Sequence, residues 1–323
     1  MILPVKRYLL PVFIVVLFIG AYSTANAEEE GSPIHVKTGI YITDIHSLDI
    51  RESTFKVTFW AWFLYAAKEY NPAKTLDVTN AMAYQISSAD VTTGDSQYPF
   101  WASMKINAVI RKDYDLSNFP FDRQVLDINF EDMYDVTRMK IEPDLKNSLV
   151  DPDIHIDGWE IEKFEFIGAT KTYHTAFGNP ILNADSKYTR TTARISVRRN
   201  GMKLFISMII VAVIGFLLSY LSIVLPPKEM GPKFSLAMCA VAAIVGAKYG
   251  LDLRLPPTSG MTLVDKTLIL IFCYVLLNVI FNVVTTCCVS KNNMAAAEKF
   301  SKVALIFVPL LFLITVVLLF VFI

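Results

Sequence analysis

Hydrophobic and polar residues follow two different patterns along the chain, and the pattern changes near residue 200. Between residues 34 and 198, apolar and polar residues alternate in short runs, as in strands with one buried face. The run 54–65, TFKVTFWAWFLY, is rich in aromatic and β-branched residues and is the clearest strand. Other strands are expected at 82–87, 100–111, 124–131, 137–142, 159–167 and 190–198. About ten short strands separated by turn signals predict an immunoglobulin-like β-sandwich over 28–200.

After residue 200, long apolar runs replace the alternation. A helix needs about 20 apolar residues to cross a bilayer, and most of these runs are that long. Together with one weaker stretch, they predict a four-helix transmembrane bundle in residues 201–323. The expected helices are 202–225, 233–253, 267–289 and 299–323.

The stretch 233–253 is poorly suited to face lipid. Its unbroken apolar run ends at Lys248, after about fourteen residues, which is short of a full span. Small or weakly polar residues recur at every third or fourth position, and at about 100° per residue they share one side of a helix. Those residues are Ser235, Cys239, Ala242, Gly246 and Tyr249. Such a stripe either packs closely against another helix or borders water, and we interpret it as the lining of a pore.

Residues 1–27 have the features of a signal peptide. A basic start precedes an apolar middle at 8–22, and Ala25-Asn26-Ala27 provides a small-x-small cleavage site. A retained membrane helix is the alternative. Cleavage places residues 28–200 outside the cytoplasm, and four spans then return the C-terminus to the same side. We therefore expect a multi-pass protein of the plasma (inner) membrane, an orientation that lysines at the inner helix ends favour.

Composition and charge argue against several classes of function. The 30 basic and 30 acidic residues balance, so no nucleic acid partner is expected. The four cysteines all lie in the membrane half and have no zinc-site spacing, so we expect no metal and no disulfide in the exported half. No P-loop, G-x-S-x-G or H-E-x-x-H motif is present, and the four histidines are scattered. We therefore expect no catalytic residue, no cofactor and no enzymatic activity.

One turn carries an unusual amount of apolar surface. Residues 113–124 read DYDLSNFPFDRQ, with two phenylalanines around a proline, followed by an acid. An apolar tip on a loop at the end of a sandwich is unfavourable in water, so we expect it to be buried against the membrane domain. The alternative is a proline turn folded onto the core of its own domain.

This turn, Phe119-Pro120-Phe121-Asp122 followed by Gln124, resembles that of the pentameric ligand-gated ion channels, the Cys-loop receptor family. The likeness covers residues 34–323 and is also carried by Thr38-Gly39-Ile40-Tyr41, Gly158-Trp159-Glu160-Ile161, Arg199 before the first helix and Leu255-Pro256 after the second. The sequence looks most like the bacterial proton-gated member. Lys112 and Leu126 stand where the family has its two loop cysteines. The resemblance implies a homopentamer, in which the second helix of each subunit lines a central pore.

The resemblance also implies a ligand site between subunits. Its residues are Tyr173 and Tyr188 on the capping hairpin, Glu131, Met133 and Tyr134 on a principal loop, and Trp60 on the complementary strand. An aromatic box with an acid suits a cationic amine, although Met133 replaces an aromatic residue. A carboxylate and a proton are the other small agonists, but Ser53 stands where the proton-gated member has a glutamate. For Trp60, a place in the sandwich core is the alternative.

Further roles at the domain junction and in the pore follow from the resemblance. It assigns gating coupling to Asp49, Phe119, Pro120, Phe121, Asp122, Arg199 and Pro256, with Asp122 and Arg199 as an ion pair. Counting back from Leu255-Pro256, the pore-lining residues are Ser235, Cys239, Ala242, Gly246, Tyr249 and Leu253. Asp252 at the outer mouth and Glu229 near the inner mouth are the selectivity residues. They favour monovalent cations, with an anion-selective channel as the alternative.

Two other classes of protein are alternatives to a channel. A membrane-anchored exported enzyme or binding protein predicts a catalytic constellation in 28–200 and lipid-suited helices throughout. A transporter predicts broken helices and internal repeats. The sequence contains none of these features, so a ligand- or pH-gated ion channel in contact with membrane lipids is the function we expect.

Overall fold

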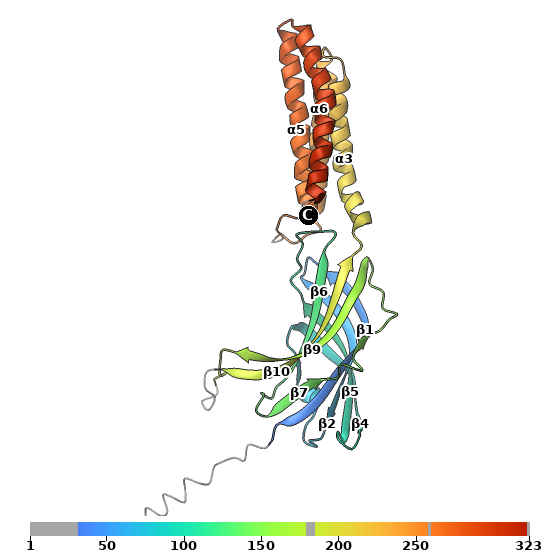
Figure 1. Ribbon diagram of the computed structural model, residues 1–323, viewed down its shortest axis with the longest axis vertical. Coiled ribbons are helices and arrows are strands. Elements are labelled where there is room, and N and C mark those ends of the chain that lie inside the picture. Colours follow the sequence, from blue (N-terminus) through green and yellow to red (C-terminus); the bar gives the residue numbers. More distant parts are fainter. Residues whose placement is uncertain (1–31, 179–184, 258–259, 322–323) are drawn as a thin grey trace, which may run out of the picture.

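A domain of strands and a bundle of helices lie end to end along the longest axis of the molecule (Figure 1). The computed structural model describes residues 32–178, 185–257 and 260–321. The predicted signal peptide, residues 1–27, lies outside the described residues. Helix α6 ends close to the strand domain, so the last helix runs back toward the junction between the two parts (Figure 1).

The described strands form two sheets. The first has the order β4-β5-β2-β1-β7, with β8 beside β1: β1 (Ile34–Asp49), β2 (Thr54–Tyr65), β4 (Ala81–Thr93), β5 (Phe100–Arg111), β7 (Met139–Pro143) and β8 (Leu149–Val150). The second has the order β3-β6-β10-β9: β3 (Leu76–Val78), β6 (Arg123–Asp132), β9 (Trp159–Tyr173) and β10 (Ser186–Arg199). A short helix, α2 (Pro72–Thr75), precedes β3.

The alternation in β2 explains why the sheets pack face to face. Phe55, Phe59 and Phe63 are buried, and the ring of Phe59 lies 5.4 Å from that of Phe130 on β6, in the other sheet. Buried residues of both sheets form one hydrophobic cluster, as in a sandwich. Trp60 lies on the opposite, half-exposed face of β2 and is therefore not in the sandwich core.

Strands β4, β9 and β10 extend further than the sequence predicts. The ladder between β9 and β10 continues to the pair Tyr173 and Ser186, beyond the expected ends at 167 and 190. The end of this hairpin projects from the side of the domain (Figure 1). Residues 167–171 are exposed on both faces, so they have no hydrophobic alternation by which the sequence could reveal a strand.

Four helices follow, and each is long and apolar enough to cross a membrane. They are α3 (Met202–Val224), α4 (Met230–Asp252), α5 (Leu263–Ser290) and α6 (Met294–Val321). They indicate a multi-pass membrane protein. Helices α4 and α6 both pack against α3 and α5. Buried polar side chains join α3 to α5: Asn278 Nδ2 donates to Ser219 Oγ at 3.1 Å, and Asn282 Nδ2 donates to Ser222 Oγ at 2.6 Å.

Three helices begin earlier than the sequence predicts, for local reasons. Helix α4 begins at Met230 rather than at residue 233, because a proline such as Pro232 fits the first turn of a helix. Helix α5 begins at Leu263 rather than 267, because Thr262 and Asp265 form a capping box. Helix α6 begins at Met294 rather than 299, where Asn293 Oδ1 accepts from Ala296 N. The expected linker 290–298 is therefore only a short turn.

The turn between β5 and β6 packs against the helices. Leu116 and Phe119 are buried in a hydrophobic cluster that includes Phe205 of α3 and Leu255 beyond α4. The ring of Phe121 lies 5.4 Å from that of Phe205. The apolar tip of the turn is therefore buried against the helical bundle rather than against the core of the sandwich.

Gly201 lets the start of α3 approach this turn. A Cβ at this position would lie 1.8 Å from the carbonyl oxygen of Pro120, so no larger residue fits without moving the backbone. We predict that Gly201→Ala lowers the free energy of unfolding by about 2 kcal/mol, the usual cost of overpacking. Thermal unfolding of detergent-purified protein measures the effect. Gly231→Ala is the control, because a Cβ at Gly231 meets nothing within 4 Å. Equal melting temperatures for the two variants would contradict the prediction.

Candidate functional site

A buried ion pair joins the β5–β6 turn to the end of β10. Arg199 Nε and Nη2 donate to Asp122 Oδ1 and Oδ2 at 2.7 and 3.2 Å, a bidentate arrangement. The Asp122 side chain is 2% exposed and that of Arg199 is 11% exposed. Gln124 Nε2 also donates to Asp122 Oδ2 at 2.8 Å. The carboxylate is therefore fully hydrogen-bonded within a few residues of the first membrane helix.

Aromatic rings enclose the guanidinium of this pair. The Arg199 Cζ lies 3.9 Å from the centre of the Trp159 ring and 5.1 Å from that of Phe119. Such stacking favours a cation that burial would otherwise penalise. Trp159 and Gln124 belong to the motifs that carry the family resemblance, but the sequence alone did not assign them to this site. The junction is thus a set of five side chains rather than an isolated pair.

The first hairpin contacts the helices through a residue that the sequence did not single out. Asp49 Oδ1 accepts from the backbone N–H groups of Arg51 and Glu52 at 3.0 and 2.9 Å, so it caps its own turn. Arg51 Nη1 donates to the Leu253 carbonyl at 3.5 Å, a long contact to the end of α4. Pro256 is half-buried just beyond this point. Among the described residues of this turn, Arg51 therefore makes the hydrogen bond to the end of α4, and Ile50 packs on the cluster that holds Leu251.

On the outer face of the second sheet, Glu131, Tyr173 and Tyr188 come together. Tyr173 Oη donates to Glu131 Oε2 at 2.9 Å, and the rings of Tyr173 and Tyr188 are 5.7 Å apart. Burial and the bond to Glu131 raise the pKa of Tyr173 above its ordinary value. Two residues complete the cluster. Phe177 packs edge-on against both tyrosines, and Arg190 Nε pairs with Glu131 Oε1 at 2.5 Å.

The other predicted ligand-site residues make their contacts elsewhere in the described chain. Met133 is largely exposed on the loop after β6. Tyr134 packs against the sandwich core and under the guanidinium of Arg138, whose Cζ lies 4.7 Å from the ring centre. Trp60 belongs to the other sheet, opposite Tyr41 of β1. One chain therefore gathers Glu131, Tyr173 and Tyr188, and leaves Trp60 outside the cluster.

The sequence offered only weak signals for Phe177 and Arg190. Phe177 has a φ of 49° and Gly178 a φ of 75°, so two left-handed residues turn the hairpin at this point. The Phe-Gly pair in the sequence hints at such a turn. Arg190 faces Glu131 because β10 pairs with β6 through Thr191 and Phe130. This register was not visible in the sequence, because it depends on which strands become neighbours.

Helix α4 has one buried stripe, and most of its remaining surface is exposed, including Met238 and Val245. Lys233, Ala237, Ala240, Ile244 and Leu251 are buried in the chain. The six predicted pore-lining residues are all exposed: Ser235, Cys239, Ala242, Gly246, Tyr249 and Leu253. Within the chain, the small residues of this stripe are therefore not used for close packing against another helix. A Cβ at Gly246 would meet nothing within 4 Å.

The C-terminal end of α4 carries a group of three charges. Lys248 Nζ pairs with Asp252 Oδ1 at 2.5 Å and with Asp265 Oδ1 at 2.7 Å. Asp265 also accepts from Thr262 as part of the capping box of α5. Asp252 is therefore not an isolated acid, and Lys248 ties α4 to the start of α5. At the other end, Glu229 is exposed, and its carbonyl accepts from Lys233 N at 3.3 Å.

A scan of protein-family models and a search of curated proteins each gave no match to this chain. Within residues 32–178, 185–257 and 260–321, no group of three His, Cys, Asp or Glu side chains is placed to hold a metal ion.

The Asp122–Arg199 pair yields a direct prediction about stability. Asp122→Asn leaves the buried guanidinium without a countercharge, and we expect a loss of about 3 kcal/mol in the free energy of unfolding. The double variant Asp122→Asn/Arg199→Gln removes both charges and should recover part of this loss. The melting temperature of the detergent-purified protein measures each effect.

Glu160→Gln is the matched control. Glu160 pairs with Arg198 at 2.6 Å, but both side chains are exposed, so the loss should stay below about 1 kcal/mol. A double variant that melts no higher than Asp122→Asn would contradict the argument from an uncompensated charge.

Proposed function

We propose that the chain is one subunit of a homopentameric ligand-gated ion channel of the Cys-loop receptor type. Five α4 helices surround a water-filled pore, and five immunoglobulin-like β-sandwiches lie outside the cytoplasm. The exposed stripe of α4 is the single observation that carries the proposal. It is small and weakly polar, in a helix that is otherwise long and apolar enough to span a membrane.

A comparison with α6 supports this interpretation of α4. The exposed face of α6 consists of large apolar side chains: Ile306, Phe307, Leu310, Leu313 and Ile314. Such a face suits lipid, because acyl chains hydrogen-bond with nothing and are as apolar as leucine. The exposed stripe of α4 instead contains a serine, a cysteine, an alanine and a glycine, and only its last two members, Tyr249 and Leu253, are large. Water in a pore explains this difference, whereas lipid on both helices does not.

The junction supports a route from the ligand site to the pore. Strand β10 runs from Tyr188 and Arg190, in the aromatic cluster, to Arg199, in the buried ion pair. Gly201 and α3 follow directly, and α3 packs along α4. A ligand held in the cluster, with Trp60 of a neighbouring copy completing the site, shifts the balance between closed and open pores through its different affinity for each. Small amines, small carboxylates and protons are the agonists to test.

The charges at the outer end of α4 support a preference for monovalent cations. Lys248, Asp252 and Asp265 together carry one net negative charge per chain. A ring of such charges attracts cations to the mouth of a pore. The presence of Lys248 in the group is the observation that favours the alternative, an anion-selective channel.

Voltage clamp of the expressed protein across a pH ramp and a panel of small amines and carboxylates tests the proposal directly. We predict an agonist-evoked current that a positively charged methanethiosulfonate reagent reduces irreversibly, because five modified copies of Cys239 would crowd the pore. In Cys239→Ala the same reagent should leave the current unchanged. That variant retains Cys273, Cys287 and Cys288, which control for modification outside the pore.

Two outcomes would contradict the proposal. One is a current that persists unchanged after mass spectrometry confirms that Cys239 is labelled. The other is silence across the whole panel from protein at the cell surface, which favours a membrane-anchored binding protein.

Lys248 provides a separate prediction about selectivity. Lys248→Met leaves two acids at the outer mouth, so the reversal potential in a sodium chloride gradient should move toward the equilibrium potential of sodium. Lys266→Met removes the same charge from α5, and we expect no shift, since Lys266 lies outside the three-charge group. A shift toward the chloride potential in Lys248→Met would exclude the assigned role.

A further inference from the structure

The charge of the ligand can be inferred from the aromatic cluster. We propose that this site binds a small carboxylate with an apolar body, held by the guanidinium of Arg190. The inference rests on the proposed function, because it names the ligand class of the same channel. It departs from the simplest view of the site, in which Glu131 would attract an amine.

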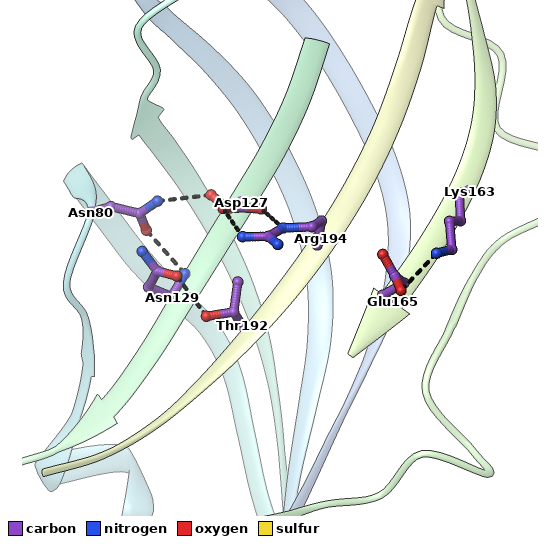
Figure 2. Close-up of polar contacts among 7 residues, drawn as sticks. All are labelled: Asn80, Asp127, Asn129, Lys163, Glu165, Thr192 and Arg194. Carbon is purple, nitrogen blue, oxygen red and sulfur yellow. Dashed lines mark hydrogen bonds and ion pairs between the residues drawn. The ribbon is translucent and has the colours of Figure 1, made fainter. Parts of the chain in front are cut away.

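Three arginines follow the outer face of β10 at intervals of four residues. Arg190, Arg194 and Arg198 each pair with an acid on a neighbouring strand. Figure 2 shows the middle one, in which Arg194 Nε and Nη2 donate to Asp127 Oδ1 and Oδ2, both at 2.9 Å. These side chains are 41% and 32% exposed. The Asp127–Arg194 pair is thus an ordinary cross-strand contact that stabilises the sheet.

The pair of Arg190 with Glu131 is more enclosed. The Arg190 side chain is 21% exposed and that of Glu131 only 6%. Each carboxylate oxygen already accepts one hydrogen bond: Oε1 accepts from Arg190 Nε, and Oε2 accepts from the Tyr173 hydroxyl. An amine could reach Glu131 only by displacing the guanidinium from a buried carboxylate, which leaves a charge without its partner. Glu131 is therefore already neutralised and inaccessible as an amine receptor.

The guanidinium still has donors to offer. Arg190 uses Nε on Glu131 and Nη2 on the Tyr173 hydroxyl, at 2.5 and 2.9 Å. Its Nη1 makes no hydrogen bond to any residue of the described chain. A guanidinium has five N–H donors in a fixed plane, and a carboxylate matches two of them side by side. The accessible charged group of the site is therefore positive, and its geometry suits an anion with two oxygens.

The surroundings of Arg190 fit the rest of such a ligand. Tyr173, Phe177 and Tyr188 pack edge to face, with ring centres 5.7 to 6.3 Å apart, and offer an apolar wall. Lys171 Nζ lies 5.9 Å from the Tyr173 ring centre and adds a second positive charge. The nearby acid on the hairpin, Asp185, pairs with His174 at 3.2 Å. Together these groups favour an anionic head on an apolar or aromatic body.

The test compares ligands that share one body and differ in charge. Binding of benzoate, benzylamine and benzamide, and of propionate and propylamine, is measured by calorimetry on the full-length, detergent-purified assembly. We expect the carboxylates to bind at least about tenfold more tightly than their amine and amide counterparts, because a charge-assisted bidentate contact is lost in the latter. Binding of amines alone, or of neither series, would overturn the proposal.

Substitutions at two positions separate the roles of the paired charges. Arg190→Gln should weaken benzoate binding about tenfold or more, whereas Arg190→Lys should weaken it less. Glu131→Gln should preserve or strengthen benzoate binding, since the guanidinium is then no longer neutralised. An amine site predicts the reverse, namely loss of ligand binding in Glu131→Gln. That result would contradict the assignment of Arg190 as the group that binds the ligand. If Arg190→Gln yields no folded protein, Glu131→Gln decides the question alone.

Arg194→Gln is the matched control, because it breaks an ion pair on the same strand outside the cluster and should leave benzoate binding unchanged. The binding measurement also separates this inference from the proposed function. Carboxylate binding without any current supports the site and argues against a channel. Currents evoked by amines or protons, with no carboxylate binding, support a channel and refute this ligand class.

Discussion

The bond between Asp122 and Arg199 is the interaction on which the arrangement of the two domains depends. It closes the contact between a turn of the sandwich and the strand that leads into α3, at 2.7 and 3.2 Å and almost out of reach of water. Burying one charge alone costs several kcal/mol, so removing either partner by itself destabilises the junction. Because Gly201 lies against Pro120 at the same point, the turn, the strand end and the helix start form one packed unit. The sandwich is therefore joined to α3 by packed side chains and an ion pair rather than by a loose linker.

A second constraint is the surface that one copy of the chain leaves exposed. The chain leaves two surfaces that a single copy does not use: the small, polar stripe of α4 and the outer face of β2 around Trp60. The aromatic cluster gathers around Arg190 and Glu131 on the other sheet. A ring of identical copies would bring β2 of one copy toward the cluster of the next and turn every α4 inward. One symmetric assembly thus accounts for both surfaces.

The sequence predicts those features that depend on periodicity and misses those that depend on which elements become neighbours. Alternation in 54–65 and the long apolar runs predicted β2 and the four membrane-length helices, whereas the short strands β3 and β8 were not predicted. The end of β9 was missed, because residues 167–171 are exposed on both faces. The pair of Lys248 with Asp252 is visible as an i, i+4 spacing, but the contact with Asp265 requires the packing of α4 on α5. Arg190 was missed for the same reason, since its partner lies on a strand nearly sixty residues away.

A single-particle reconstruction of the full-length protein in lipid nanodiscs tests the central claim most directly. The account predicts five-fold symmetry, with α4 nearest the axis and with Cys239, Gly246 and Tyr249 facing the central space. A monomer, a ring of another order, or an α4 whose small stripe faces lipid or a helix of its own bundle would contradict it.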